Sequence, residues 1–306
     1  MNILKRELFH LKRNKELLLL AIPGIIFVLV FNYYPMFGLQ IAFKNYTYDK
    51  GIWGSDWVGF RNFTFFFTSQ DVFRITRNTI LYNAGCIIIG TAAAVIFALI
   101  LNELSRKSLK VLQTAFLMPY FLSWVVASFI LYAFLGTDYG VMNQLVTSLG
   151  GDRIMWYNEP VFWPAIIMIC YLWKNVGYLA IIYYTGLMGV DIAYYEAAEI
   201  DGATKLQQIR YISIPMLRPL VILMTLLAIG RIFYSDFGMF YFLPRNSGIL
   251  FGATDVIDTY VYRALRKSGD VGMASAVGAY QSLVGFVLVF LSNKLSKRID
   301  ESGSIF

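Results

Sequence analysis

Long apolar runs alternate with shorter polar stretches along the chain. Each run approaches or exceeds the roughly 20 residues that a helix needs to cross a bilayer core. Four runs carry no Asp, Glu, Lys or Arg; one contains Lys174, and another contains Arg231 and Asp236. Because lipid offers no partners for backbone groups, we predict helices. The expected fold is an all-α polytopic membrane protein with about six transmembrane helices, at residues 17–43, 80–101, 111–135, 161–188, 219–240 and 271–291.

The composition agrees with a lipid environment. Hydrophobic residues make up 58% of the chain and charged residues 15%, with a mean hydropathy of +0.59. A soluble domain has about 25% charged residues. No polar linker separates two cores, so we predict a single transmembrane domain over residues 1–306. The first run is too long for the apolar part of a signal peptide and has no small-residue cleavage site before Asn32, which predicts a retained helix.

Basic residues cluster at the ends of the apolar runs. The net charge is +7, which in a soluble protein would suggest nucleic acid as a partner. Here the positive-inside rule explains it, and we expect no nucleic-acid partner. With six spans, both termini and the second inter-span loop lie on the cytoplasmic side; the long first outer loop is basic too, but long loops obey the rule weakly. The cytoplasmic group comprises Lys5, Arg6, Lys12, Arg13, Lys15, Arg106, Lys107, Lys110, Lys294, Lys297 and Arg298.

Metal-binding side chains are scarce. Cys86 and Cys170 both lie inside apolar runs without CxxC spacing, as packing residues do, and His10 is the one histidine. We therefore predict no zinc or haem site.

The polar loop at residues 190–215 has its own helical pattern. Asp191 is a suitable N-cap, and Gly202 can end the first helix in a left-handed turn. A second helix can begin near Thr204 and run to Ile212, before Pro215 stops it. The sequence therefore predicts a helix, a sharp turn and a second helix on the cytoplasmic side.

This loop resembles the EAA loop of permeases from binding-protein-dependent ABC importers. The matching pattern is Glu196-Ala197-Ala198, three residues, Gly202, nine residues and Ile212-Ser213-Ile214-Pro215; Ile214 stands where the family usually has Leu. The run from Tyr195 to Ala203 is similar to the sugar-importing branch, and so is the segment from Trp173 to Tyr178. Segments 34–46 and 58–63 resemble permeases that import complex oligosaccharides.

The resemblance implies a type I ABC importer permease fold and a carbohydrate cargo. It also implies that the loop docks on a separate ATPase, which would use the ATP and Mg²⁺; this chain itself would hold no cofactor. The expected partners are a second permease subunit of different sequence, two ATPase subunits and an extracytoplasmic solute-binding protein. The expected location is the bacterial plasma membrane. The residues implied in ATPase coupling are Glu196, Ala197, Ala198, Asp201, Gly202, Ile212 and Pro215.

Polar side chains inside the apolar runs are candidates for a cargo pathway. Intramembrane charges usually face a cavity or a partner, and Lys174 and Arg231 would suit an acidic or heavily hydroxylated sugar. An alternative of equal weight is that Arg231 pairs with Asp236 or reaches the membrane surface. The candidate pathway residues are Lys174, Asn175, Tyr178, Arg231, Tyr234 and Asp236.

Other function classes lack their required residues. The glycine spacing of Gly85 and Gly90 is followed by Thr91 without the lysine of a phosphate-binding loop. The apolar runs carry no catalytic His or carboxylate pair, so we predict that the chain is not an enzyme. A permease for polar amino acids would usually be shorter and lack the Ile-Asp-Gly-Ala run. A secondary transporter of a polar solute remains the alternative, with Asp236 as its ion-coupling carboxylate.

Overall fold

The computed structural model describes residues 15–68 and 71–299. His10 and the basic residues before Lys15 lie outside this part. The described chain forms two compact units, one from residues 15–68 with 267–279 and the other from residues 71–266 with 280–299. The prediction of a single domain stays a prediction, and each unit is described by itself.

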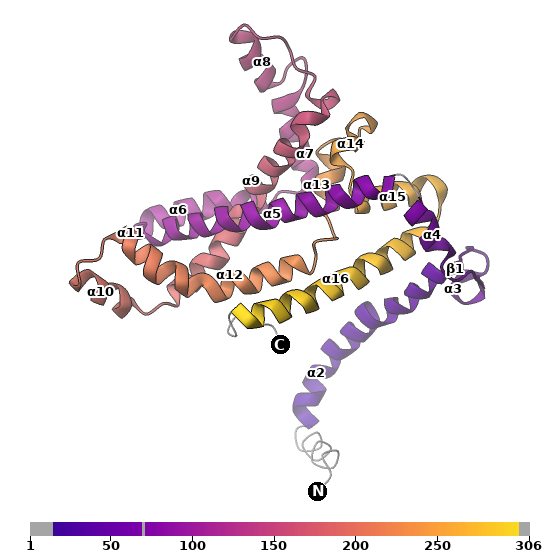
Figure 1. Cartoon of the computed structure of the whole chain (residues 1–306), viewed down its shortest axis with the longest axis horizontal. Coiled ribbons are helices and arrows are strands. Elements are labelled where there is room, and N and C mark those ends of the chain that lie inside the picture. Colours follow the sequence, from indigo (N-terminus) through magenta and orange to yellow (C-terminus); the bar gives the residue numbers. More distant parts are fainter. Residues whose placement is uncertain (1–14, 69–70, 300–306) are drawn as a thin grey trace. The chain divides into compact units, whose positions relative to one another are not determined.

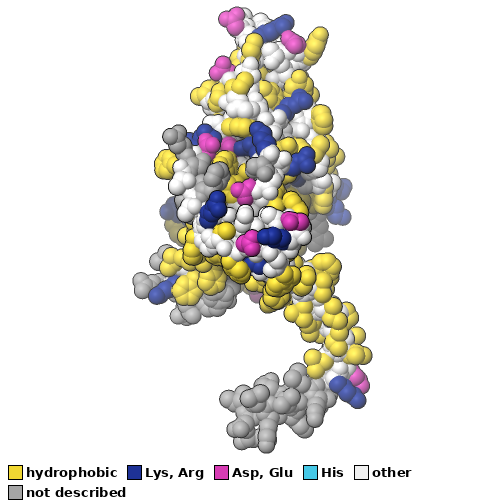
Figure 2. Space-filling model, turned by 90° about the vertical axis from the view of Figure 1, so that its right-hand side faces the viewer, with side chains coloured by type: hydrophobic (Ala, Val, Ile, Leu, Met, Phe, Trp, Pro, Cys, Tyr) yellow, Lys and Arg dark blue, Asp and Glu magenta, His cyan; other side chains and the backbone are white. Residues whose placement is uncertain are grey.

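The first unit begins with a long helical segment, Lys15–Phe43, that meets the length and hydropathy needed to cross a membrane. It consists of α2 (Lys15–Val28), the π-helical turn η1 (Leu29–Tyr33) and the 3-10 helix η2 (Tyr34–Phe43). The helix continues through residues 32–35 and changes there from π-helical to 3-10 geometry. Pro35 lies in the first turn of η2, where its missing N–H costs little. Figure 2 shows hydrophobic side chains over most of the visible face of this helix.

A segment of short strands and helices completes the first unit. Strands β1 (Lys44–Asn45) and β2 (Asp56–Trp57) pair antiparallel, with Lys44 opposite Trp57. Between them lies α3 (Gly51–Gly54), and α4 (Arg61–Thr68) follows. The first turns of α16 (Val271–Ile299) also belong to this unit.

The regular secondary structure of the second unit is helical among its described residues, with loops and turns between the helices (Figure 1). Helices α5 and α9 pack against each other along their lengths and carry much of the core. Close approach of α9 to α6 requires Gly177, because a Cβ there would lie 1.9 Å from the Phe116 carbonyl oxygen. The elements are α5 (Asp71–Asn102), α6 (Arg106–Leu117), η3 (Met118–Phe121), α7 (Trp124–Leu135), α8 (Val141–Ser148), η4 (Trp156–Asn158), η5 (Pro160–Phe162), α9 (Trp163–Met188), α10 (Ile192–Ile200), α11 (Lys205–Gln208), η6 (Ile209–Ser213), α12 (Ile214–Ile229), α13 (Phe237–Phe242), η7 (Gly248–Leu250), α14 (Phe251–Thr254), α15 (Ile257–Ser268) and the rest of α16.

The described residues contain five helices that could each cross a membrane, or up to six if one bent pair counts as a span. The bent pair is the run predicted as one straight helix over residues 111–135. The helix axis bends by 101° between its two halves, Lys107–Phe121 and Trp124–Leu135. Pro119 lies in the first turn of η3, and Ser123 caps α7 by accepting a hydrogen bond from the Val126 N–H at 3.3 Å. A proline followed by an N-cap ends one helix and starts the next.

The fifth run also differs from its prediction. Pro215 was expected to end the second loop helix, but helical structure continues from Lys205 to Ile229. The π-helical turn η6 leads into α12 with Pro215 in its first turn, a position that tolerates proline. The predicted span 219–240 is instead divided, because α12 ends at Ile229 and α13 begins at Phe237.

Candidate coupling loop and translocation site

The loop at residues 190–215 forms the helix, turn and helix that the sequence predicts. Asp191 caps α10, since its Oδ1 accepts a hydrogen bond from the Ala193 N–H at 3.0 Å. Figure 1 shows α10 beyond the end of α12 at which the loop enters it. The loop therefore presents a short helix directly connected to a membrane-crossing one.

The turn between α10 and α11 is closed by two complete capping motifs. Gly202 has φ +81°, a left-handed conformation that glycine adopts without strain. The N–H of Ala203 donates to the Ala198 carbonyl at 2.8 Å, and the N–H of Gly202 donates to the Glu199 carbonyl at 3.0 Å. These are the two bonds of a Schellman motif. On the other side, Thr204 and Gln207 form a reciprocal capping box.

Side-chain contacts hold the two loop helices together. The Tyr195 hydroxyl lies 3.0 Å from Ser213 Oγ. Lys205 Nζ donates to Glu199 Oε1 at 2.7 Å and to Gln208 Oε1 at 3.2 Å. The hydrogen bond from Lys205 lowers the pKa of Glu199. The loop is thus a preformed unit whose backbone ends are satisfied internally.

The outward face of the loop keeps polar groups without a partner. Glu196 and Asp201 are exposed, and no hydrogen bond or ion pair joins either side chain to another described residue. Ala197 is exposed, whereas Ala198 and Ile212 are half-buried. Glu196 also lines a cavity of about 520 Å³ at the base of the loop, together with Glu199 and Lys205. This face can accept a polar or cationic partner without disturbing the loop.

A second polar cluster lies inside the helices of the second unit. Lys174 is 8% exposed, and its Nζ donates to the Tyr120 carbonyl at 2.6 Å. The same Nζ lies 5.3 Å from the ring centroid of Trp124, whose indole Nε1 donates to Asp236 Oδ2 at 2.6 Å. Trp124 therefore joins a cation on α9 to a carboxylate at the start of α13. Of the six candidate pathway residues, the structure brings Lys174 and Asp236 together here.

The remaining candidates lie around this cluster in different ways. Tyr178 stacks on Tyr120 with centroids 4.3 Å apart and is 40% exposed, so an aromatic face is available beside Lys174. Asn175 donates to the carbonyl of Tyr171 on its own helix at 3.1 Å. Arg231 is exposed, and no ion pair joins it to Asp236 among the described side chains.

Tyr234 and Arg231 belong to the non-helical segment that divides the fifth run. Backbone outside a helix is tolerated in a membrane protein where protein groups satisfy it. Asn83 Nδ2 on α5 donates to the carbonyl of Ile232 at 2.8 Å and to Ser235 Oγ at 3.2 Å. Gln281 Nε2 donates to the carbonyl of Phe233 at 2.6 Å. The Ser235 N–H donates to Asp258 Oδ2 and the Tyr234 hydroxyl lies 2.6 Å from Ser282 Oγ, so side chains from three helices, α5, α15 and α16, hold this break.

Sequence reasoning did not select several of these residues. Trp124 and Tyr120 were read as part of an unbroken span, although Pro119 and Ser123 beside them signal a helix end and a helix start. Asn83 and Gln281 lie in runs without charge, and a single amide in such a run gives no pattern that predicts its partner.

The match to a known protein family covers most of the chain. Residues 86–301 match the family described as binding-protein-dependent transport system inner membrane component. The chain belongs to this family. The permease is accordingly a multi-pass inner-membrane protein, and the family is one of transport permeases rather than enzymes.

Individual relatives and solved structures agree with this assignment. The permease is 36% identical to the protein LplB of Bacillus subtilis (strain 168) over 96% of this chain and 92% of LplB. It is also 36% identical to the polygalacturonan/rhamnogalacturonan transport system permease protein YteP of the same organism, over 98% of this chain and 93% of YteP. A chain of a bacterial alginate ABC transporter, solved in complex with an alginate pentasaccharide-bound periplasmic protein, superposes with a TM-score of 0.85 at 30% identity, covering 95% of this chain and 96% of that one. The predicted type I importer permease fold is confirmed.

Proposed function

We propose that the permease imports an acidic oligosaccharide, which an extracytoplasmic binding protein delivers and a separate ATPase drives inward. The observation that carries the coupling is the loop at residues 190–215. Its helix ends at the turn are satisfied by local caps, yet Glu196 and Asp201 are exposed without a partner among the described residues. A preformed surface with exposed acidic groups suits a protein partner with cationic groups.

Movement of the loop would reach the membrane interior through a continuous helical path. Helical structure runs from Lys205 to Ile229 and ends at the break at residues 230–236, which includes Asp236. When the partner ATPase binds ATP and Mg²⁺ and closes, a displacement of the loop would move this path and the break at its far end. Transporters bind cargo near such discontinuous helices and alternate access around them.

The chemistry around the break suits a sugar with acid groups. Lys174 uses one of its three donors on the Tyr120 carbonyl, which leaves two for a carboxylate or hydroxyl. Asp236 can accept from hydroxyls, and the face of Tyr178 can contact a sugar ring. The names of relatives point the same way, because YteP is named for polygalacturonan and rhamnogalacturonan and the solved transporter imports the acidic polysaccharide alginate.

The proposed assembly contains this permease, a second and different permease chain, two ATPase subunits and the binding protein. Both termini of this chain and the loop at residues 190–215 would face the cytoplasm. The solved alginate transporter in complex with its periplasmic protein supports the position of a binding protein on the opposite side.

Co-purification from membranes tests the coupling. We expect an ATPase subunit to copurify with the unchanged permease and to be lost with the Glu196→Arg, Gly202→Asp double variant. Glu159→Arg is the matched control, because Glu159 is also exposed but lies outside the loop; it should keep the ATPase. Retention of the ATPase by the double variant would show that the loop is not its docking site.

Import by the reconstituted assembly tests the cargo. Proteoliposomes with ATP inside should take up labelled trigalacturonate when its binding protein is present, and should take up maltotriose poorly. Lys174→Met should reduce trigalacturonate uptake without loss of the ATPase subunit. Equal uptake of both sugars would contradict an acidic cargo.

A further inference from the structure

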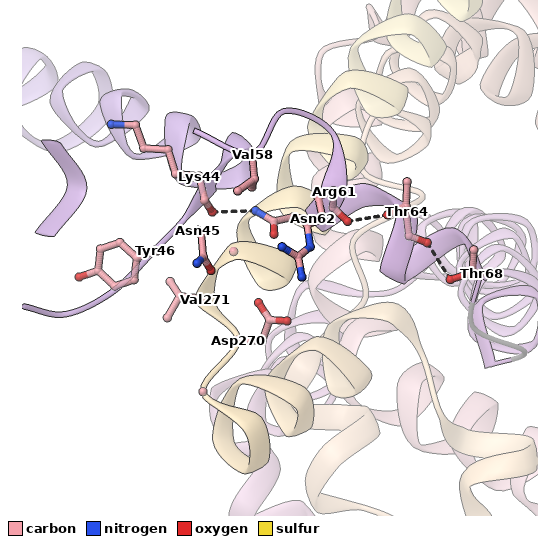
Figure 3. Close-up of a pocket in the computed structure, with 12 residues that line it drawn as sticks. Lys44, Asn45, Tyr46, Val58, Arg61, Asn62, Thr64, Thr68, Asp270 and Val271 are labelled. Atoms are coloured by element: carbon pink, nitrogen blue, oxygen red, sulfur yellow. Dashed lines mark hydrogen bonds between the residues drawn. The ribbon is translucent and has the colours of Figure 1, made fainter. Parts of the chain in front are cut away.

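The first unit contains a polar cavity of about 600 Å³ (Figure 3). Its walls come from the segment that follows the first membrane-crossing helix and from the start of α16. This volume lies within the roughly 300–1,000 Å³ of small-molecule sites. In the proposed topology both segments lie on the side where cargo arrives.

Some polar side chains at the wall are already occupied by the fold. Asn62 Nδ2 donates to the carbonyls of Ala42 at 3.0 Å and of Lys44 at 2.9 Å. Lys44 Nζ donates to the Ile52 carbonyl at 2.7 Å, and in Figure 3 its side chain runs away from the cavity. These contacts fix the walls: the Asn62 amide nitrogen is taken up by backbone carbonyls, and the Lys44 ammonium is directed away from the cavity.

Other polar groups at the wall remain available. Among the described residues, the Arg61 guanidinium and the Asn45 amide make no hydrogen bond or ion pair. Asp270 accepts from the Met273 N–H at 2.8 Å through Oδ1, which leaves Oδ2. Figure 3 shows the Arg61 and Asp270 side chains directed toward each other. No ion pair within 4.0 Å joins them among the described side chains, so the space between them can admit a ligand group.

We propose that this cavity binds one uronic acid unit of the cargo oligosaccharide. A planar guanidinium can hold a carboxylate through two parallel hydrogen bonds. Asp270 Oδ2 accepts from a ring hydroxyl, and the Asn45 amide can donate to or accept from another. Val58 and Val271 add apolar wall for the C–H groups of the sugar ring. This proposal rests on the proposed function and gives it a recognition site apart from the Lys174 cluster.

Binding to the full-length permease alone, in lipid nanodiscs without ATPase or binding protein, is the test. The probe is trigalacturonate, with maltotriose as the neutral comparison, and calorimetry gives the affinities. We expect Arg61→Gln to weaken trigalacturonate binding about tenfold, as the loss of a charged hydrogen-bond pair implies, and to remove its advantage over maltotriose. Asp270→Asn keeps the capping oxygen and should weaken both sugars.

Matched controls lie in the same unit. Lys50→Gln and Asp49→Asn remove a charge of each sign from exposed positions that do not line the cavity, and should leave both affinities unchanged. The proposal is overturned if Arg61→Gln and Asp270→Asn bind trigalacturonate as tightly as the unchanged permease, or if Lys174→Met alone abolishes binding. It is also overturned if no saccharide binds and Arg61→Gln instead weakens docking of the binding protein.

Import by the whole assembly separates this proposal from the proposed function. If trigalacturonate is imported but does not bind the unchanged permease alone, the cavity proposal is wrong and the importer function stands. If the assembly imports neither sugar, the proposed function fails, while binding at Arg61 is judged by the calorimetry alone.

Discussion

The helix break at residues 230–236 and the loop at residues 190–215 differ in where their polar groups find hydrogen-bond partners. At the break, Asn83, Gln281 and Asp258 from three other helices satisfy the backbone or its flanking groups. In the loop, the backbone is satisfied by local caps, and Glu196 keeps no partner among the described residues. The backbone groups at the break need hydrogen-bond partners from the protein, because lipid offers no donors or acceptors. The polar side chains of the loop can instead bind water or another protein.

This difference predicts where substitutions cost folding and where they cost function. Removal of a donor at the break leaves a partly or fully buried acceptor without that partner, which costs about 1–3 kcal/mol. Removal of an exposed side chain that has no partner changes the free energy of unfolding little.

Asn83→Leu should have the largest effect. It removes the donor to the Ile232 carbonyl and to Ser235 Oγ, and we expect a loss of about 2 kcal/mol. Thermal unfolding of the purified permease in detergent measures it. Asn158→Leu is the control, because Asn158 is exposed and its amide contacts only Met155 Sδ at 3.7 Å among the described atoms. If both variants unfold at the same temperature, side-chain support of the break is not required for stability.

Trp124→Phe should have a smaller but coupled effect. Phenylalanine keeps a ring near Lys174 and loses the hydrogen bond to Asp236. In a double-mutant cycle with Asp236→Asn, we expect a coupling free energy of about 1–2 kcal/mol in unfolding, together with reduced import. Strict additivity of the two substitutions would mean that the 2.6 Å contact contributes nothing to stability.

The sequence predicts the structural features that depend on local patterns. The apolar runs indicate the membrane helices, and Asp191, Gly202 and Thr204 mark the ends of the loop helices because caps act within a few residues. The break at residues 230–236 depends on partners more than a hundred positions away, such as Asn83, and hydropathy does not contain that information. The prediction that Pro215 ends the second loop helix was wrong, because proline is compatible with the first turn of a helix and Pro215 lies in the first turn of α12.

Glu196→Gln tests whether the exposed carboxylate in the loop contributes to coupling without contributing to folding. We expect no measurable change in thermal unfolding, because no described residue pairs with this carboxylate. ATP hydrolysis stimulated by the loaded binding protein should fall severalfold in the reconstituted assembly, since a charge at the proposed contact is lost. Unfolding at a lower temperature would place Glu196 in the fold instead, whereas normal stimulated hydrolysis would remove it from the coupling surface.

The smallest effect concerns Glu199, which lies one turn from Glu196 but has a partner. The hydrogen bond from Lys205 lowers the pKa of Glu199, so the pair stabilises the loop above the ordinary glutamate pKa of 4.5. This contribution is lost as the pH falls through the lowered value. Because both groups are exposed, the change should be confined to the turn. Hydrogen exchange at the Gly202 and Ala203 amides, corrected for the intrinsic pH dependence, should show protection that decreases on acidification in the unchanged permease. In Glu199→Gln the protection should be lower at neutral pH and nearly independent of pH, and an equal pH dependence in both proteins would assign the effect to another group.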